Sequence, residues 1–346
     1  MNTANSALLV SPVYRAFLKR THPHLRIDEA PLDAPSFIAS LDVREPLLPG
    51  ISKDLLEQIR RVAPNFVVPQ TLFIGTPFER YNQTHLLDEI KNVSQFTLDA
   101  KRCAKSLGLP LVVLTNVSPF HRCLQEWLDE GFCPLPSFPD TVVQIKDTDF
   151  DSHLMRLPQA NRSGIRRNMR KFSDAGYHLE RLDSSSEHAS ELFEAYVPFF
   201  ERARVRWQKH TLAYFAEVAD LSEDVFLTAA KTKNNEIAGF VLNFRDQNGF
   251  QAGRIGVRPG FYKTYGIYFR LIYHLFEETL EQKGRHLSLE PTGYRMKRHL
   301  GADAVPMVNL VFGVDRRWQF LLKSGAGVGR KLLSHLEDLS KLEKEY

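Results

Sequence analysis

The chain has 346 residues, of which 43% are hydrophobic and 25% are charged, and its net charge is +4. This composition suits a soluble globular protein of about two domains, and the mild positive charge permits an anionic ligand without indicating nucleic acid. No apolar stretch approaches the ~20 residues that cross a bilayer, and Met1–Ser11 lacks the basic region and the length of a signal peptide. Cys103, Cys123 and Cys133 form no CxxC pair, so neither a disulfide framework nor a zinc knuckle is indicated. We therefore expect a cytoplasmic protein without a metal.

The first half alternates predicted strands and helices. Helices are expected at Tyr14–Lys19, Lys53–Ala63, Asn82–Leu107 and Phe120–Gly131, and strands at Ser36–Asp42, Leu72–Ile74, Leu111–Leu114 and Thr141–Ile145. The run Leu111–Leu114 is continuously apolar, which is typical of a strand covered on both faces. Such alternation favours an α/β domain. The acidic cluster Asp147–Asp151 is the predicted domain boundary.

The second half begins with helices and continues as a sheet. Helices are expected at His153–Ser173 with a break at Pro158, at Ser186–Arg206 and at Thr211–Val218, and a strand at Tyr177–Arg181. Three strands then follow in a row, at Val225–Lys231, Glu236–Arg245 and Phe250–Val257. Asn234 and Gly249 stand in the short connections, as hairpin turns prefer. Val305–Val314 is the predicted last strand, and Leu332–Tyr346 a charged helix.

The stretch Gly253–Gly301 carries the most useful chemistry. It is predicted to form a strand, a turn at Arg258–Gly260, a helix from Ile267 to Gly284, a strand at His286–Glu290 and a short helix at Pro291–Leu300. A helix that follows a strand presents backbone N–H groups at its N-terminus, which attract anions.

A basic segment precedes this stretch. Arg162, Arg166 and Arg170 recur at four-residue spacing, Arg167 and Lys171 form a neighbouring stripe, and no acid follows until Asp174. On a helix these side chains form one positive face. Two interpretations stay open, a solvated basic face and a surface that binds the phosphates of CoA or of a tRNA backbone.

Glu290, Tyr294 and Lys297 form the candidate catalytic group. Tyr294 and Lys297 lie three residues apart and share one helix face, and Glu290 ends the preceding strand. Acyl transfer to an amine needs a base, an oxyanion donor and an acid for the leaving group, which a carboxylate, a phenol and an ammonium can supply. The alternative is that Glu290 pairs with a core arginine and that Lys297 is an ordinary surface cation.

Aromatic and histidine side chains complete the candidates. Tyr265 and Tyr268 lie in the first turns of the long helix and are predicted to bind a ligand, whereas Tyr273 is expected in the core. His22 and His24 have no metal-like partner at helical spacing, so a surface loop is expected there.

Several stretches together resemble the GNAT acyltransferases, and in particular their FemAB-like branch, which joins two such domains. The similar stretches are FIGTPF at Phe73–Phe78, NRSGIRRNMRKF at Asn161–Phe172, EIAGFVLNFRD at Glu236–Asp246, GIYFRLIYHLFEETLEQKG at Gly266–Gly284 and LEPTGYRMKRHLGA at Leu289–Ala302. The resemblance extends roughly from Leu72 onward. It implies an α/β fold of two tandem GNAT-like domains with mixed central sheets, residues 1–147 and 148–346, with the active site in the second.

The resemblance also implies a reaction, the direct transfer of an acyl or aminoacyl group to an amine without a metal or a covalent enzyme intermediate. The donor would be acyl-CoA or an aminoacyl-tRNA, and the acceptor a small-molecule or peptide amine. The expected donor-binding residues are Arg162, Arg166, Arg167, Arg258, Gly260, Tyr265, Gly266 and Tyr268. The GNAT pyrophosphate loop is usually Arg/Gln-x-x-Gly-x-Gly/Ala, which Arg258–Gly266 matches only loosely. This departure favours the alternative, a GNAT-like binding protein without catalysis.

Overall fold

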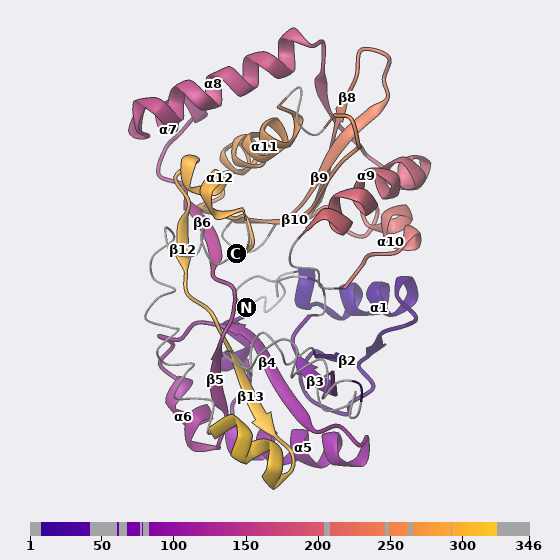
Figure 1. Cartoon of the computed structure of the whole chain (residues 1–346), viewed down its shortest axis with the longest axis vertical. Coiled ribbons are helices and arrows are strands. Elements are labelled where there is room, and N and C mark those ends of the chain that lie inside the picture. Colours follow the sequence, from indigo (N-terminus) through magenta and orange to yellow (C-terminus); the bar gives the residue numbers. More distant parts are fainter. Residues whose placement is uncertain are drawn as a thin grey trace, which may run out of the picture. The chain divides into compact units, whose positions relative to one another are not determined.

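A computed structural model describes residues 8–41, 61, 68–76, 78, 83–203, 208–245, 249–261, 266–291 and 293–323 (Figure 1). The chain divides into two compact units, and the described part of each is built from two segments. Unit 1 takes Met1–His22 and Thr141–Asp303, and unit 2 takes Pro23–Asp140 and Ala304–Glu345. The helix expected at Lys53–Ala63, apart from Arg61, and the C-terminal helix lie outside the described residues.

Unit 1 is built on a seven-stranded mixed sheet with the order β12-β6-β11-β10-β9-β8-β7. Its strands are β6 (Asp140–Gln144), β7 (His178–Arg181), β8 (Val225–Lys231), β9 (Ile237–Arg245), β10 (Gly249–Val257), β11 (His286–Ser288) and β12 (Asp303–Val305). Strands β8 to β10 form the predicted antiparallel meander, and β7 pairs with β8 antiparallel. Strand β11 pairs with β10 in parallel, and β6 pairs with β11 antiparallel.

Helices cover both faces of this sheet (Figure 1). They are α1 (Pro12–Thr21), α7 (Phe150–Arg156), α8 (Gln159–Asp174), α9 (Ala189–Arg202), α10 (Leu212–Glu217), α11 (Ile267–Glu281) and α12 (Tyr294–His299), with short 3-10 turns at Leu8–Val10 and Ser186–His188. Side chains alternate along β9, as a strand requires. Phe240 contacts Phe215 of α10 at a centroid distance of 5.6 Å, whereas Val241 lies in the core cluster with α11 and α8.

Unit 2 has a six-stranded mixed sheet with the order β1-β2-β3-β4-β13-β5. Its elements are β1 (Arg26–Ile27), β2 (Ser36–Ser40), β3 (Gln70–Ile74), α4 (His85–Glu89), α5 (Val93–Ser106), β4 (Leu111–Val117), α6 (Leu124–Asp129), β5 (Cys133–Pro136) and β13 (Val308–Gly313). Every residue of β4 is buried, as its apolar run predicts. The core of unit 2 packs around Trp127 of α6 and the strands β3, β4 and β13.

Two strands belong to a different sheet from the one that the sequence suggests. Strand β6 lies beside β11 in unit 1 although it was assigned to the N-terminal domain. Strand β13, expected to close the C-terminal domain, lies between β4 and β5 of unit 2. The structural division therefore differs from a single boundary after residue 147. Periodicity identifies a strand but carries no information on which distant strand it pairs with.

Other differences are local. The helix expected at Asn82–Leu107 is two helices, α4 and α5, because Asn92 adopts an extended conformation and its side chain caps α5 by accepting from the Gln95 N–H at 2.9 Å. Helix α6 is shorter than predicted, and β5 follows it unpredicted. None of the helices in the described part of the chain is long and apolar enough to span a membrane.

Candidate functional site

The candidate site lies where β10 and β11 stop pairing. The two parallel strands pair from Gly249 with His286 to Gln251 with Ser288, and within the described residues no further pair joins them, although β10 continues to Val257. On its other side, β10 shifts register against β9 between Ala252 and Ile255. Such an irregularity bends a strand and redirects its side chains. Sites in open α/β sheets gather at the carboxyl ends of parallel strands, and this opening is such a place.

Glu290 occupies the turn that follows β11. Its φ of +58° is in the left-handed region, which is uncommon for a residue with a Cβ. Two hydrogen bonds to its carbonyl oxygen hold this peptide, from the Thr141 hydroxyl and from Lys297 Nζ, both at 2.6 Å. Its carboxylate lies 3.1 Å from Nη1 of Arg254, and both side chains are 16% exposed. The pairing with a core arginine, which the sequence left as the alternative, is thus present.

Lys297 is buried rather than a surface cation. Only 4% of it is exposed, and Nζ donates to the carbonyl oxygens of Leu289, Glu290 and Pro291 at 2.6, 2.6 and 3.0 Å. An ammonium has three N–H donors, and three carbonyls accept them here. The interpretation of Lys297 as a surface cation is therefore wrong, and its visible role is to hold the turn that carries Glu290.

Tyr294 begins α12 after Gly293, whose φ is +62°, so the helix starts later than the predicted Pro291. Tyr294 and Lys297 are both buried and lie on one helix face, as their spacing predicts. A Cβ at Gly293 would lie 3.7 Å from the Tyr268 hydroxyl and 3.9 Å from Lys297 Cε. Tyr268 itself stacks on Phe199 at a centroid distance of 5.8 Å. The structure thus brings Tyr268 and Lys297 to one point, beside the start of α12.

Two residues of this region were not singled out from the sequence, Arg254 and His210. Arg254 lies in the bulged part of β10, and its Nε donates to Nε2 of His210 at 2.8 Å. His210 is 1% exposed, and burial, followed by the charges of Arg254 and His22, lowers its pKa well below 6.5. An arginine within a strand of apolar and glycine neighbours was the available signal for Arg254. The surface loop expected at His22 is wrong, because His22 is fully buried with its ring 5.4 Å from that of His210.

The basic segment forms α8, and its arginines fall into two kinds. Ile165 and Phe172 face the core, so Arg166, Arg167, Arg170 and Lys171 are exposed. Arg166 pairs with Asp151 at 3.4 Å, an exposed contact of the kind that contributes little to stability. Arg162 instead donates to the carbonyl oxygens of Met155 and Leu157 at 3.1 and 2.9 Å, at the end of α7. Arg162 therefore has a structural contact that the others lack.

The remaining predicted donor-binding residues precede or begin α11 in the sequence. Arg258 pairs with Glu194 at 3.0 Å, and Gly260 has a φ of +92°. Gly266 caps α11 with a φ of +67°, and a Cβ there would lie 3.0 Å from the Asn168 carbonyl oxygen of α8. Only glycine suits such a close approach at positive φ. The start of α11 therefore lies directly against the basic helix, whereas Tyr265 lies outside the described residues.

Unit 2 contains a comparable parallel pair, β3 and β4, whose end is filled by Gln83. The strands pair from Thr71 with Leu111 to Ile74 with Leu114. Just beyond, the Gln83 amide oxygen accepts from the Thr76 N–H at 3.1 Å, and its nitrogen donates to the Thr115 hydroxyl at 2.8 Å. This buried contact makes unit 1 the better candidate for a ligand site.

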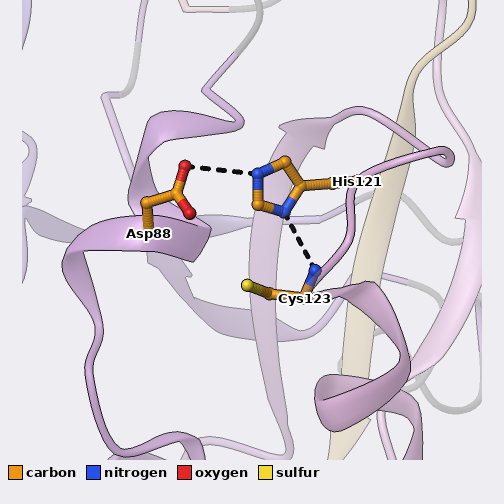
Figure 2. Close-up of side chains that lie close together, drawn as sticks. All are labelled: Asp88, His121 and Cys123. Carbon is orange, nitrogen blue, oxygen red and sulfur yellow. Dashed lines mark hydrogen bonds and ion pairs between the residues drawn. The ribbon is translucent and has the colours of Figure 1, made fainter.

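Three residues of metal-ligand type also come together in unit 2, Asp88, His121 and Cys123 (Figure 2). His121 Nδ1 accepts from the Cys123 backbone N–H at 3.3 Å, so the ring proton is on Nε2, which faces Asp88 Oδ2 at 3.2 Å. A metal on Nε2 would require that proton on Nδ1, where it would meet the N–H of Cys123. Arg122 also donates to Asp88 at 3.1 Å and lowers the pKa of its carboxyl. The arrangement fits a hydrogen-bonded turn better than a metal centre.

Comparisons with known proteins bear on the fold. Residues 159–298 match the family model described as acetyltransferase (GNAT) domain. FemX is similar in structure with a TM-score of 0.54 and 11% identity, over 92% of this chain and 95% of FemX. L-PGS from Bacillus licheniformis has a TM-score of 0.52 and 13% identity, over 94% of this chain and 99% of that one. A conserved protein of unknown function from Bacteroides thetaiotaomicron VPI-5482 has a TM-score of 0.51 and 11% identity, over 90% and 92%.

No curated protein sequence matches the chain significantly. At 11–13% identity the structural similarity establishes the fold alone. The expected α/β fold with two mixed sheets is confirmed, and as a fold it is similar to that of FemX. The matched residues 159–298 contain α8, Arg254, Glu290 and Lys297, so the domain match covers the site described here.

Proposed function

We propose that the protein transfers an acyl or aminoacyl group from a CoA thioester or an aminoacyl-tRNA to an amine, because residues 159–298 match the family model of a GNAT acetyltransferase domain. The observation that carries the proposal is the end of the β10–β11 pairing, spanned by the 3.1 Å ion pair of Arg254 and Glu290. Two partly buried charged side chains at the carboxyl ends of parallel strands form a place where a reacting group can be held.

The donor would lie along β10 and reach the start of α11. Backbone N–H and C=O groups of a strand that has lost its neighbour can pair with amides of an extended ligand, such as the arm of CoA. The phosphates of either donor are polyanionic, and the helix N-terminus beside Gly266 attracts anions. The backbone of Asn168 in α8 abuts Gly266, so this basic helix lies beside the start of α11. These features support a phosphate-bearing donor and suit both classes.

The acceptor amine would bind at Glu290. Its nitrogen attacks the acyl carbon, the bond to the CoA sulfur or to the ribose oxygen breaks, and one proton leaves the nitrogen. The Glu290 carboxylate is the proposed acceptor of that proton, directly or through a water. Tyr294 is the proposed donor to the leaving group. Lys297, whose Nζ contacts three backbone carbonyls, acts in this proposal by holding Glu290 in position.

One set of contacts favours a second candidate, a GNAT-like binding protein without catalysis. Arg258 pairs with Glu194, and Lys297 contacts three backbone carbonyls of its own unit. Because both cations already have partners within unit 1, neither is available to stabilise charge that develops during a reaction, which favours binding without catalysis.

The experiment that separates these functions starts with a native mass spectrum of the purified protein. Bound CoA or acyl-CoA supports the thioester donor, and bound RNA supports the tRNA donor. Turnover is then measured by product mass, with acetyl-CoA and with a mixture of aminoacyl-tRNAs, each against a panel of amines. Product formation that Glu290→Gln abolishes would establish the transferase. Binding of either donor without product would favour the non-catalytic protein.

A further inference from the structure

A buried histidine lies at one end of a series of polar contacts that ends at Glu290. His210 is 1% exposed and precedes the N-cap of α10. Its Nε2 accepts from Arg254 Nε at 2.8 Å, and Arg254 Nη1 donates to Glu290 Oε2 at 3.1 Å. The order from the interior to the opening is therefore His210, Arg254, Glu290.

Contacts from several elements hold Arg254 and Glu290 in place. Arg254 stands in the bulged part of β10, and its Nη1 also donates to the carbonyl oxygen of Gly253 at 2.7 Å. On the other side, Thr141 and Lys297 hold the Glu290 peptide in its left-handed conformation. The position of the carboxylate thus depends on contacts from β10, β6 and α12.

The charge of His210 is the variable element. Because Nε2 accepts a hydrogen bond, the imidazole is neutral with its proton on Nδ1. The groups that face it are His22 of the α1 C-cap with ring centroids 5.4 Å apart, Tyr214 of α10 at 3.8 Å, Tyr196 of α9 at 5.8 Å, and the Arg254 guanidinium. None of these described neighbours supplies a negative charge to His210. Burial and the Arg254 charge accordingly lower its pKa.

We propose that His210 and Arg254 are positioning residues that orient the Glu290 carboxylate for the transfer reaction. The inference rests on the proposed function, in which Glu290 accepts the proton of the amine. Protonation of His210 removes the lone pair that Arg254 needs and sets two cations side by side. Arg254 then moves, and the carboxylate it orients moves with it. The transfer therefore requires a neutral His210.

The decisive variants are His210→Gln and His210→Phe. Glutamine can place an amide oxygen where Nε2 stands and does not titrate, whereas phenylalanine fills the space without an acceptor. We expect His210→Phe to lower kcat by about 10–100-fold with little change in KM for the donor, as for a displaced catalytic group. His210→Gln should retain most of kcat and should keep it to lower pH than wild type. The control is His178→Gln, an exposed histidine of β7, which should leave the pH profile unchanged.

A second measurement is independent of turnover. Nitrogen-15 NMR of the imidazoles of the full chain, between pH 5.5 and 8, should show His210 neutral and protonated on Nδ1, and Arg254→Gln should raise its titration midpoint. If the spectrum shows this tautomer but wild type forms no product, the proposed function is wrong while the hydrogen bond from Arg254 to His210 is confirmed. The inference is overturned if His210→Phe, folded by circular dichroism, matches wild type in kcat and pH profile. It is also overturned if His210 is protonated on Nε2 at pH 7.

Discussion

Lys297 and Glu290 are joined through the backbone rather than through their charges. Lys297 Nζ lies 2.6 Å from the Glu290 carbonyl oxygen, while the Glu290 carboxylate pairs with Arg254 on the neighbouring strand. The lysine thereby stabilises a left-handed residue, a conformation that costs about 1–3 kcal/mol. The strain is located at the residue proposed to carry the chemistry, so the local backbone and the proposed reaction depend on the same contacts.

Replacing Lys297 by Met should therefore destabilise the protein. The change leaves three buried carbonyl groups without their donor, and we expect a loss of about 2–4 kcal/mol in the free energy of unfolding. This reverses the expectation from the sequence, under which a surface cation could be removed at little cost. The measurement is urea unfolding, with Arg295→Met as the control because Arg295 is exposed on the same helix. Equal stability of Lys297→Met and wild type would exclude the structural role.

Glu290→Gln tests the chemistry at the same turn. The amide keeps the shape and removes the proposed base, so kcat should fall by ~10²–10⁴-fold. Stability should also fall, by about 1–3 kcal/mol, because Arg254 loses its charged partner. The double variant Glu290→Gln with Arg254→Gln should lose less stability than the sum of the two single changes. Normal turnover by Glu290→Gln would show that the base lies elsewhere.

The sequence predicts the local part of this site and not the contacts across the sheet. The spacing of Tyr294 and Lys297 predicts one helix face, which the structure shows, whereas Glu290, predicted to end a strand, lies in the turn after β11. Lys297 was expected at the surface because lysine is rarely buried, and only the positions of the three carbonyls explain its burial. His210 and Arg254 are 44 residues apart, so no local pattern links them.

The wrong assignment of β6 and β13 to sheets also arises because pairing between distant strands leaves no local pattern. The apolar run of β13 matches a buried strand equally well in either sheet, and its partners β4 and β5 precede it by about half of the chain. Alternation of strands and helices therefore indicated an α/β fold correctly but left the membership of β6 and β13 undetermined. For Gly266, the positive φ is a local property of the turn, whereas the contact with Asn168 joins distant parts of the chain and has no local signal.

A buried acid in unit 1 gives a pH-dependent prediction. Glu278 is 6% exposed, and burial raises its pKa above the ordinary 4.5, although His274 and a hydrogen bond from Asn243 oppose the shift. Because the folded state holds this proton more tightly than the unfolded state, the contribution of Glu278 to stability falls as the pH rises through 4.5 and the folded-state pKa. Glu278→Gln should accordingly be more stable than wild type at pH 8, and the difference should shrink toward pH 4. Urea unfolding at both pH values checks this, and a variant less stable than wild type at pH 8 would contradict it.

The last prediction separates the two kinds of arginine on α8. Arg166 and Arg167 are exposed, unlike Ile165 and Phe172 of the same helix, so changing both to Gln should leave stability nearly unchanged. If they contact donor phosphates, binding of acetyl-CoA or aminoacyl-tRNA should weaken by about 1–3 kcal/mol, and its salt dependence should decrease together with the affinity. Arg162→Gln should act in the opposite way and lower stability, because its guanidinium contacts the carbonyls at the end of α7. Lys233→Gln, which removes an exposed charge in the β8–β9 connection, is the control for the loss of a surface cation elsewhere in unit 1. Donor affinity that is the same for the double variant, the control and wild type across a salt series would identify the stripe as a solvated face.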